Sequence, residues 1–319
     1  MNDKDKKPFR VFSNCQEYSI PIWQCPAFLF SVMGIINVTS CLFFYFLGGR
    51  YIKEPSMLAI IILGIATFMF FLAYAVTRSV EKLMEINRNK TEFIKIVSHQ
   101  LRAPLTNIRW SIDFVMSNRK GKTEVNVEKE KDYFELIKEN SQRLEDLLSD
   151  LLIVNRLNEE NFFKYKEDVN FVDVIKETLQ DYKYLAKASN VEIITRVIDK
   201  PVYVFANKIL IETAFENLVK NSIIFNKQGG KVEISLFRHP KEILVAVKDE
   251  GPGIPKADRK YIFQRFFRGS KAFHTQTQGT GLGLYIAKAV ITKHGGKIWF
   301  KTKEGQGTTF FITLPMRKI

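Results

Sequence analysis

The sequence predicts a protein of three parts: two transmembrane helices, an antiparallel helical hairpin that forms a four-helix bundle in a dimer, and an α/β sandwich. Three observations predict this fold class: two long uncharged apolar segments, an apolar stripe of helical spacing after them, and a mixed strand and helix pattern in the second half. The 319 residues are 46% hydrophobic and 26% charged, which excludes a disordered or fibrous chain. Three cysteines without a C-x-x-C motif exclude a disulfide scaffold and a cysteine-based zinc site.

The first part is a predicted transmembrane hairpin over residues 27–77. Residues 27–47 and 57–77 contain no charged side chain, and a helix needs about 20 apolar residues to cross a bilayer. The segment 48–56 is the expected external loop. The alternative is a buried helical pair in a soluble protein, where uncharged runs of this length are rare.

Basic residues flank the predicted membrane hairpin on both sides. They gather in the tail 1–26 and after residue 77, whereas the loop has only Arg50 and Lys53. Lysine and arginine favour the cytoplasmic side. The expected location is therefore the cell (inner, cytoplasmic) membrane, in a multi-pass arrangement with both termini in the cytoplasm and the lipid bilayer as a partner.

Residues 78–158 are predicted to form a dimerisation domain built from a helical hairpin. Apolar residues recur there every three or four positions, which is typical of one face of a helix. The first stripe comprises Ile94, Val97, Leu101, Leu105, Ile108, Ile112 and Val115. After a break near Gly121, the second comprises Tyr133, Leu136, Ile137, Leu144, Leu147, Leu148, Leu151 and Val154. Two antiparallel helices alone cannot bury both stripes, so a homodimer is expected.

Residues 159–319 are predicted to form an α/β sandwich with helices on one face of the sheet. The patterns predict helices over 171–188, 207–226 and 282–294. They predict strands over 191–197, 202–205, 231–238, 242–249, 297–302 and 308–314. Strands mixed with helices favour this layered architecture. The net charge of +14 is compatible with an anionic membrane surface, and no zinc-finger, basic-zipper or RNA-binding motif supports direct binding of nucleic acid.

His99 lies on the first helix of the hairpin, away from the apolar stripe. At about 100° per residue it is roughly 165° from the centre of that stripe, so its imidazole is expected to face solvent. An exposed imidazole can act as a nucleophile, although most exposed helical histidines are ordinary surface residues. Pro104 favours a functional role for His99, because a proline inside a helix removes a backbone hydrogen bond and bends the helix near the histidine. His294, at the end of a predicted helix, is expected to have a capping or dipole role.

Two glycine-rich segments predict a phosphate-binding site. DEGPGI (249–254) follows a predicted strand, and GTGLGL (279–284) precedes a predicted helix. Glycine lets backbone N–H groups approach phosphate, and a helix N-terminus favours negative charge. The segments match neither a Walker loop nor the dinucleotide fingerprint, and ordinary turns with a helix cap are the alternative. Asn217 and Asn221 share a helical face, and their amide oxygens could hold Mg²⁺ beside phosphate, although such a pair is often only a surface feature.

These segments and two others resemble the sequence boxes of a known family. SHQLRAPLTNI (98–108) resembles a phosphoacceptor box and ENLVKNSIIFN (216–226) an N box. The two glycine segments resemble the family's glycine boxes, and IFQRFFRG (262–269) resembles its aromatic lid box. Over about residues 80–319 the chain resembles the membrane-bound sensor histidine kinases of bacterial-type two-component systems. Five boxes in one order make this resemblance specific.

The resemblance implies a homodimeric protein-histidine kinase that uses ATP and Mg²⁺. Its sandwich would be an ATP-binding domain of the histidine kinase, gyrase and heat-shock type. His99 would accept the phosphoryl group, and Gln100 would orient the His99 imidazole. The phosphoryl group would then pass to an aspartate in the receiver domain of a separate response regulator. Asn221 would ligate Mg²⁺, and Asp249 would accept a hydrogen bond from the adenine amino group. The implied nucleotide-binding residues are Asn217, Asn221, Phe225, Lys227, Asp249, Gly251, Gly253, Gly279, Thr280, Gly281, Leu282, Gly283 and Thr308. The implied lid residues are Phe263, Phe266 and Phe267.

Three positions depart from the family pattern. Gln100 replaces the usual acid and cannot take a proton, which predicts slower autophosphorylation. Ala103 replaces a threonine or asparagine that orients water, which puts phosphatase activity in doubt. Ile224 replaces a phosphate-reaching lysine, for which Lys227 could substitute.

Two alternatives and one expectation about sensing accompany this interpretation. The departures would also fit a catalytically impaired, nucleotide-binding membrane scaffold. The second alternative is an ATPase of the gyrase and heat-shock type, which hydrolyses ATP. Such enzymes use a carboxylate to activate water at the position where this chain has Asn217. Because the second span ends only 22 residues before His99, a continuous helix is expected to join them, and the stimulus is expected to act on the membrane helices, their loop or a membrane partner.

Overall fold

The computed structural model describes residues 25–120, 127–157, 159–197, 200–269 and 279–317. Almost all of the expected cytoplasmic tail, 1–26, therefore lies outside the described residues. The chain divides into two compact units, Met1–Ser98 and His99–Ile319. Helix α3 contributes residues to both.

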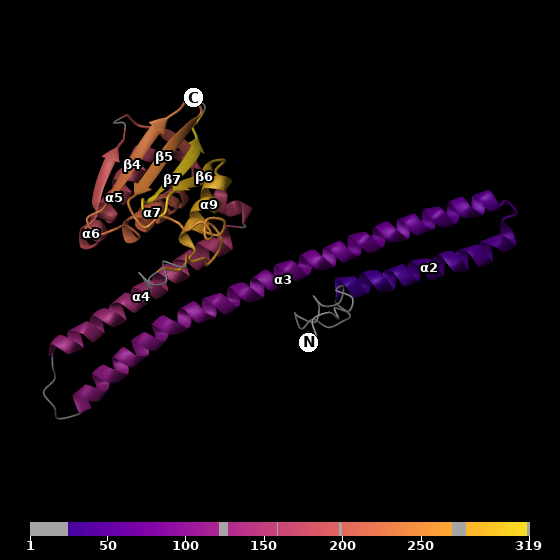
Figure 1. Cartoon of the computed structure of the whole chain (residues 1–319), viewed down its shortest axis with the longest axis horizontal. Helices are drawn as coiled ribbons and strands as arrows, with labels where there is room; N and C mark the ends of the chain where they lie inside the picture. Colours follow the sequence, from indigo (N-terminus) through magenta and orange to yellow (C-terminus); the bar gives the residue numbers. More distant parts are fainter. Residues whose placement is uncertain (1–24, 121–126, 158, 198–199, 270–278, 318–319) are drawn as a thin grey trace, which may run out of the picture. The chain divides into compact units, whose positions relative to one another are not determined.

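The first unit contains a hairpin of two long helices. Helix α2 spans Pro26–Tyr51, and helix α3 spans Pro55–Lys120 (Figure 1). The non-helical link is thus shorter than the expected loop 48–56, because α2 continues through Gly48 and α3 begins at Pro55, where the missing N–H costs nothing. The helices contact each other within this unit, since Asn37 Nδ2 donates to Ala66 O at 3.1 Å.

The helices of the first unit expose large apolar side chains. Phe46 is 82% exposed and Ile60 is 70% exposed. By length and composition, α2 and α3 are both apolar enough to cross a membrane. Cys25 is in a disulfide bond, and Cys41 is a free thiol.

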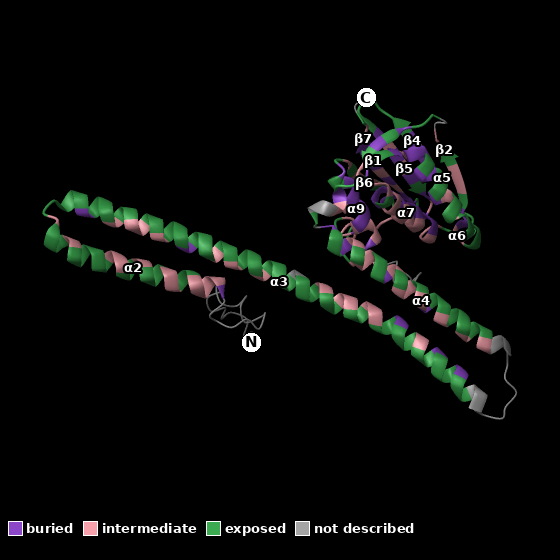
Figure 2. Cartoon of the chain, turned by 180° about the vertical axis from the view of Figure 1, so that it is seen from behind, coloured by how far each residue is buried: buried purple, intermediate pink, exposed green. Residues whose placement is uncertain are grey.

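In the second unit, the end of α3 and helix α4 (Val127–Arg156) form the hairpin predicted from the apolar stripes. Pro104 and Val115 of α3 are buried, as are Leu147 and Val154 of α4. The large apolar side chains that stay exposed on the hairpin are Leu105, Trp110, Ile112, Phe114, Met116, Phe134, Leu136, Leu148 and Leu152. Figure 2 shows this exposed character along both helices.

The rest of the second unit is an α/β sandwich. Its five-stranded sheet has the order β2-β4-β5-β7-β6, with β2 parallel to β4 and the other pairs antiparallel. The strands span Glu192–Arg196 (β2), Lys231–Arg238 (β4), Glu242–Asp249 (β5), Lys297–Thr302 (β6) and Thr308–Pro315 (β7). A separate antiparallel pair joins β1 (Glu167–Asn170) to β3 (Tyr203–Ala206).

The helices of the sandwich cover one face of the sheet (Figure 1). They span Phe171–Asp181 (α5), Lys183–Ala188 (α6), Lys208–Ile224 (α7) and Gly283–Lys293 (α9), and a 3-10 turn (η2) spans Glu160–Phe163. Alternate residues of β4, including Val232 and Ile234, are buried beneath them. Phe171 of α5 and Phe215 of α7 are both fully buried, with ring centroids 5.6 Å apart.

The predicted elements of the sandwich are present, with two differences. The predicted helix 171–188 is broken at Tyr182 into α5 and α6. Strand β1 was not predicted, because EDVN has no apolar alternation and becomes a strand only by pairing with β3. Asn170 ends this strand and caps α5, since its side chain accepts a hydrogen bond from Val172 N.

Candidate active site

Asp249 ends strand β5 as a buried carboxylate. The residue is only 6% exposed, and its Oδ1 accepts hydrogen bonds from Gly251 N at 2.9 Å and Thr308 N at 3.0 Å. Burial raises the pKa of Asp249 to about 6, although these two hydrogen bonds oppose the shift. Both bonds reach the same oxygen, so among the described residues Oδ2 is the oxygen left to receive a further donor.

The first glycine segment packs tightly against the end of helix α7. A β-carbon at Gly251 would come within 2.2 Å of the carbonyl oxygen of Phe225, so no larger residue fits there. Phe225 is the C-cap of α7. Lys227, just beyond, pairs with Glu250 at 3.1 Å. Gly253 lies against the backbone of Lys303.

Helix α7 brings Asn217 beside the second glycine segment. A β-carbon at Gly283 would lie 2.5 Å from Asn217 Oδ1, so the start of α9 approaches α7 in a way that only glycine permits. Asn217 Nδ2 donates to Thr213 O at 3.0 Å, which orients its amide. Asn221 lies one turn further along α7 and is half-buried.

The second glycine segment forms the entry to helix α9. Leu282, its N-cap residue, is fully buried, and its N–H donates to Thr280 Oγ1 at 3.1 Å. Gly279 faces open space, whereas Gly281 lies against the backbone of Phe266. The unfilled space at Gly279 and the N-terminus of α9 suit a phosphate group.

The aromatic box lies on the same side of the fold as this segment. Phe263 packs on Phe300 of β6, with ring centroids 6.0 Å apart. Phe267 packs on Tyr261, the residue just before the box, with ring centroids 5.7 Å apart. Ring contacts therefore hold Phe263 on the sandwich and Phe267 on the residue that precedes the box.

His99 is exposed on α3, as the helical wheel predicted. The next residue, Gln100, donates from Nε2 to the carbonyl oxygen of Thr280 at 3.2 Å. This hydrogen bond joins Gln100 to the glycine segment and not to the His99 imidazole, so the orienting role of Gln100 stays a prediction. The second glycine segment thus lies next to the turn of α3 that bears His99.

Helix α4 makes polar contacts with the sandwich that the sequence did not reveal. Thr280 Oγ1 donates to Asp150 Oδ2 at 2.6 Å, and Lys220 Nζ pairs with Asp146 Oδ2 at 2.9 Å. Burial raises the pKa of Asp150, against the Thr280 hydrogen bond and Lys220, which lower it. The one available signal was the i, i+4 spacing of Asp146 and Asp150, which says nothing about their partners.

His294 is a structural residue that joins two helices. It is 5% exposed, its Nδ1 donates to Val290 O at 2.8 Å, and its Nε2 accepts from Asn207 N at 3.1 Å. Burial lowers its pKa, which favours the neutral form that these two contacts require. The expected role at a helix end fits this position, and the link to the N-cap of α7 is an addition from the structure.

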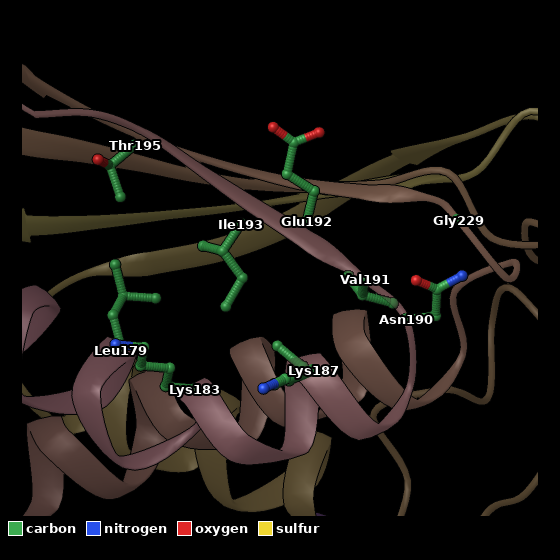
Figure 3. Close-up of a pocket in the computed structure, with 10 residues that line it drawn as sticks. Leu179, Lys183, Lys187, Asn190, Val191, Glu192, Ile193, Thr195 and Gly229 are labelled. Atoms are coloured by element: carbon green, nitrogen blue, oxygen red, sulfur yellow. The ribbon is translucent and has the colours of Figure 1, made fainter.

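A pocket of about 670 Å³ lies elsewhere, between helices α5 and α6 and strand β2 (Figure 3). Leu179, Lys183 and Lys187 line it from the helices, and Ile193 lines it from the strand. None of the predicted site residues lines this pocket. It is therefore separate from the glycine segments.

The arrangement as a whole defines a class of protein: a helical hairpin with an exposed histidine, joined to an α/β domain whose buried carboxylate and glycine segments suit a nucleotide. Comparisons with known families agree. Residues 89–160 match the His Kinase A (phospho-acceptor) domain. Residues 206–318 match the histidine kinase-, DNA gyrase B-, and HSP90-like ATPase domain.

Individual relatives point to the same family. The chain is 32% identical over 246 residues to the sensor histidine kinase WalK of Bacillus subtilis (strain 168), covering 76% of this chain and 39% of that protein. It is 30% identical over 247 residues to the sensor protein kinase WalK of Staphylococcus aureus, covering 77% of this chain and 58% of that protein. The chain therefore spans only part of the length of the curated relatives it matches.

Solved structures share the fold. The complex of histidine kinase ThkA with response regulator protein TrrA matches with a TM-score of 0.56 and 24% identity, over 76% of this chain and 66% of that one. The Acinetobacter baumannii histidine kinase AdeS matches with a TM-score of 0.54 and 22% identity, over 69% of this chain and 98% of that one. With both domains matched in order, the chain belongs to the sensor histidine kinases of two-component systems.

Proposed function

We propose that this protein is a protein-histidine kinase that phosphorylates His99 with ATP and then passes the phosphoryl group to an aspartate of a separate response regulator. One observation carries most weight: the glycine segment at the start of α9 touches Gln100, the neighbour of the exposed His99. Phosphoryl transfer requires mainly positioning and charge neutralisation, and this contact brings the two required surfaces together.

Asp249 and the glycine segments would hold the nucleotide. Asp249 Oδ2 accepts the adenine amino group, while Oδ1 stays fixed by Gly251 and Thr308. Residues around the adenosine and phosphates are Asn217, Phe225, Lys227, Gly253, Gly279, Thr280, Gly281, Leu282 and Gly283, with Phe263, Phe266 and Phe267 in the lid. Support comes from the close approaches at Gly251 and Gly283, which shape a backbone cradle that side chains would otherwise fill.

Mg²⁺ would be held by the amide oxygen of Asn221 together with phosphate oxygens of the nucleotide. Among the described residues, no group of three or more His, Cys, Asp or Glu side chains could hold a metal. A site made of one amide and nucleotide oxygens fits the preference of Mg²⁺ for oxygen ligands and retained waters. The ion would supply charge neutralisation on the phosphates.

His99 supplies the nucleophile. The lone pair of an unprotonated imidazole nitrogen attacks the γ-phosphorus, the bond from that phosphorus to the bridging oxygen breaks, and ADP leaves. Exposure of His99 on α3 gives the imidazole access to the bound nucleotide. The neighbouring Gln100 cannot accept the proton that the imidazole loses, so water or buffer takes it and the step is slower than with a carboxylate. Ala103 has no polar group in its side chain to orient a hydrolytic water, so phosphatase activity is expected to be weak.

The acting molecule would be a homodimer in the cell membrane, with both termini in the cytoplasm. The apolar side chains left exposed on α3 and α4 support a four-helix bundle, because patches of this kind normally mark an interface. The exposed apolar surfaces of α2 and the first part of α3 support contact with the lipid bilayer. The unbroken α3 could transmit a change in the membrane helices to His99.

The response regulator partner is supported by a structural relative: ThkA is seen in complex with the response regulator TrrA. No feature of the described residues favours direct binding of nucleic acid by this chain. The domain boundaries that fit this proposal are 1–26, 27–77, 78–158 and 159–319.

Autophosphorylation of the full chain in detergent, with labelled ATP and Mg²⁺, tests the proposal. Acid-labile, base-stable label should appear in the wild type and be lost in His99→Ala and Asn221→Ala. ATP binding by a folded dimer without any label would contradict the proposal and favour the impaired scaffold, with Gln100, Ala103 and Ile224 as its explanation.

A further inference from the structure

Two carboxylates of helix α4 hold the two elements that flank the proposed nucleotide site. Asp146 pairs with Lys220 of α7, directly before the proposed Mg²⁺ ligand. Asp150, one turn later, accepts from the Thr280 hydroxyl at the entry to α9. Because residues four apart share one helical face, both contacts come from the same side of α4.

The contact around Thr280 involves both helices of the hairpin. Its carbonyl oxygen accepts from Gln100 of α3, and its hydroxyl donates to Asp150 of α4. A small pocket of about 10 Å³ lies here, lined by Gln100, Pro104, Arg143, Leu147, Gly279 and Thr280. The two hydrogen bonds of Thr280 therefore attach the glycine segment to both helices of the hairpin.

All of these contacts lie within one chain, which bears on the choice between two acceptor histidines in a dimer. The proposed dimer packs through the apolar stripe, and His99 lies roughly 165° away from that stripe. The two acceptors therefore face opposite sides of a bundle whose neighbouring helix axes are about 8–10 Å apart. A sandwich seated at Gln100 of its own chain reaches its own His99 and not His99 of the partner subunit.

We propose that Asp146 and Asp150 are positioning residues that dock the sandwich onto the hairpin of the same chain, so that each chain phosphorylates its own His99. This inference rests on the proposed kinase function. Neither carboxylate need touch ATP, because each acts through Lys220 or Thr280.

The docking role is tested by the kinetics of labelling in the full chain in detergent. Asp150→Ala should lower the maximal rate of autophosphorylation about tenfold, the size expected for loss of one charge-assisted hydrogen bond, and leave the KM for ATP within about twofold. Asp150→Asn should retain most of the rate, because its amide oxygen can still accept from Thr280. Glu145→Ala, on an exposed neighbour in the same helix, is the matched control and should behave as wild type.

A charge exchange tests the second contact. Asp146→Lys and Lys220→Asp should each slow labelling, and the double variant should recover much of the rate, because the exchanged charges can pair again. An unchanged or faster rate in Asp150→Ala, or no recovery in the double variant, would contradict docking by these carboxylates.

Mixed dimers, purified with two different tags, test which histidine is phosphorylated. A wild-type chain paired with a His99→Ala/Asn221→Ala chain should be labelled, on the wild-type chain. A His99→Ala chain paired with an Asn221→Ala chain should remain unlabelled. The reverse pattern would overturn phosphorylation within one chain while leaving the kinase function intact. A wild-type homodimer that binds ATP and takes no label would instead contradict the kinase function itself.

Discussion

The hairpin and the sandwich of the second unit differ in how far they bury their apolar side chains. In the sandwich, Phe171 and Phe215 are completely buried, and the inward residues of its central strands are covered by helices. In the hairpin, Leu105 is 54% exposed and Leu148 is 58% exposed. The sandwich therefore completes its own core, whereas the hairpin leaves apolar side chains uncovered, which is the surface that the proposed dimer would bury.

This difference divides the work of the proposed kinase. A self-contained core can hold Asp249 and the glycine segments in fixed positions, as nucleotide binding requires. A hairpin stabilised by association can alter its packing when a signal arrives, because its helices have more than one way to cover their apolar faces. The substitutions below test the two regions, from the largest expected effect to the smallest.

The largest effect is expected at the hairpin interface. Leu105→Asp with Ile112→Asp places charges on the exposed apolar stripe of α3. The dissociation constant of the dimer should rise by about 100-fold or more, because the interface would bury unpaired carboxylates. Sedimentation of the full chain in detergent measures this, with nucleotide binding retained. Thr106→Asp, at an exposed position on the side of α3 away from the stripe, is the control, and a stable dimer in the double variant would contradict the proposed interface.

A large effect on stability is expected in the core of the sandwich. Phe215→Ala should lower the free energy of unfolding by about 3–5 kcal/mol, because it removes a fully buried ring that packs on Phe171. Phe237→Ala removes a ring that is 50% exposed and should cost about 1 kcal/mol or less. Urea unfolding, followed by hydrogen exchange in the sandwich, distinguishes the two. Equal losses of unfolding free energy in the two variants would contradict the assignment of Phe215 to the core.

Asp249→Asn should separate stability from function. Because the pKa of Asp249 is raised from 3.8 to about 6 in the folded protein, folding favours its protonated form, and the stability that this form contributes is present in full below the lower pKa and is lost as the pH rises to about 6. The asparagine variant should therefore be more stable than wild type by about 1–2 kcal/mol at pH 7.5, and this difference should shrink toward pH 5.

The same variant should bind ATP poorly. Its Oδ1 can keep the hydrogen bonds from Gly251 and Thr308, which places the NH₂ group where the adenine amino group needs an acceptor. Calorimetric titration with a non-hydrolysed ATP analogue measures this loss. Unchanged affinity in a stabilised variant would remove Asp249 from the adenine site.

The smallest effect is expected at an exposed ion pair of the hairpin. Arg109 and Asp113 lie 3.8 Å apart, with side chains 83% and 68% exposed. Arg109→Ala should change the free energy of unfolding by no more than about 0.5 kcal/mol, because solvent screens such pairs. A loss several times larger, measured by thermal unfolding in low and high salt, would place this face inside the bundle.

Local patterns in the sequence predicted most of the elements correctly. The helical stripes, the alternation in β4 and β5, and the glycine segments before and after secondary structure all depend on neighbours within a few residues. Sequence patterns failed where structure depends on distant partners. EDVN becomes strand β1 because β3 lies beside it, and the break at Tyr182 divides a segment whose apolar spacing looked continuous.

The sequence by itself determined the kind of protein: its two apolar spans, its helical hairpin with an exposed His99, and its nucleotide-type sandwich. The spans, the hairpin and the layered sandwich follow from composition and periodicity, and the nucleotide-binding type follows from the resemblance of the short motifs to a known family. Only the tertiary structure decided the burial that raises the pKa of Asp249 and the seating of Thr280 between Gln100 and Asp150. The physical reason is separation along the chain, since Asp150 and Thr280 lie 130 positions apart and only folding brings their side chains within hydrogen-bonding distance.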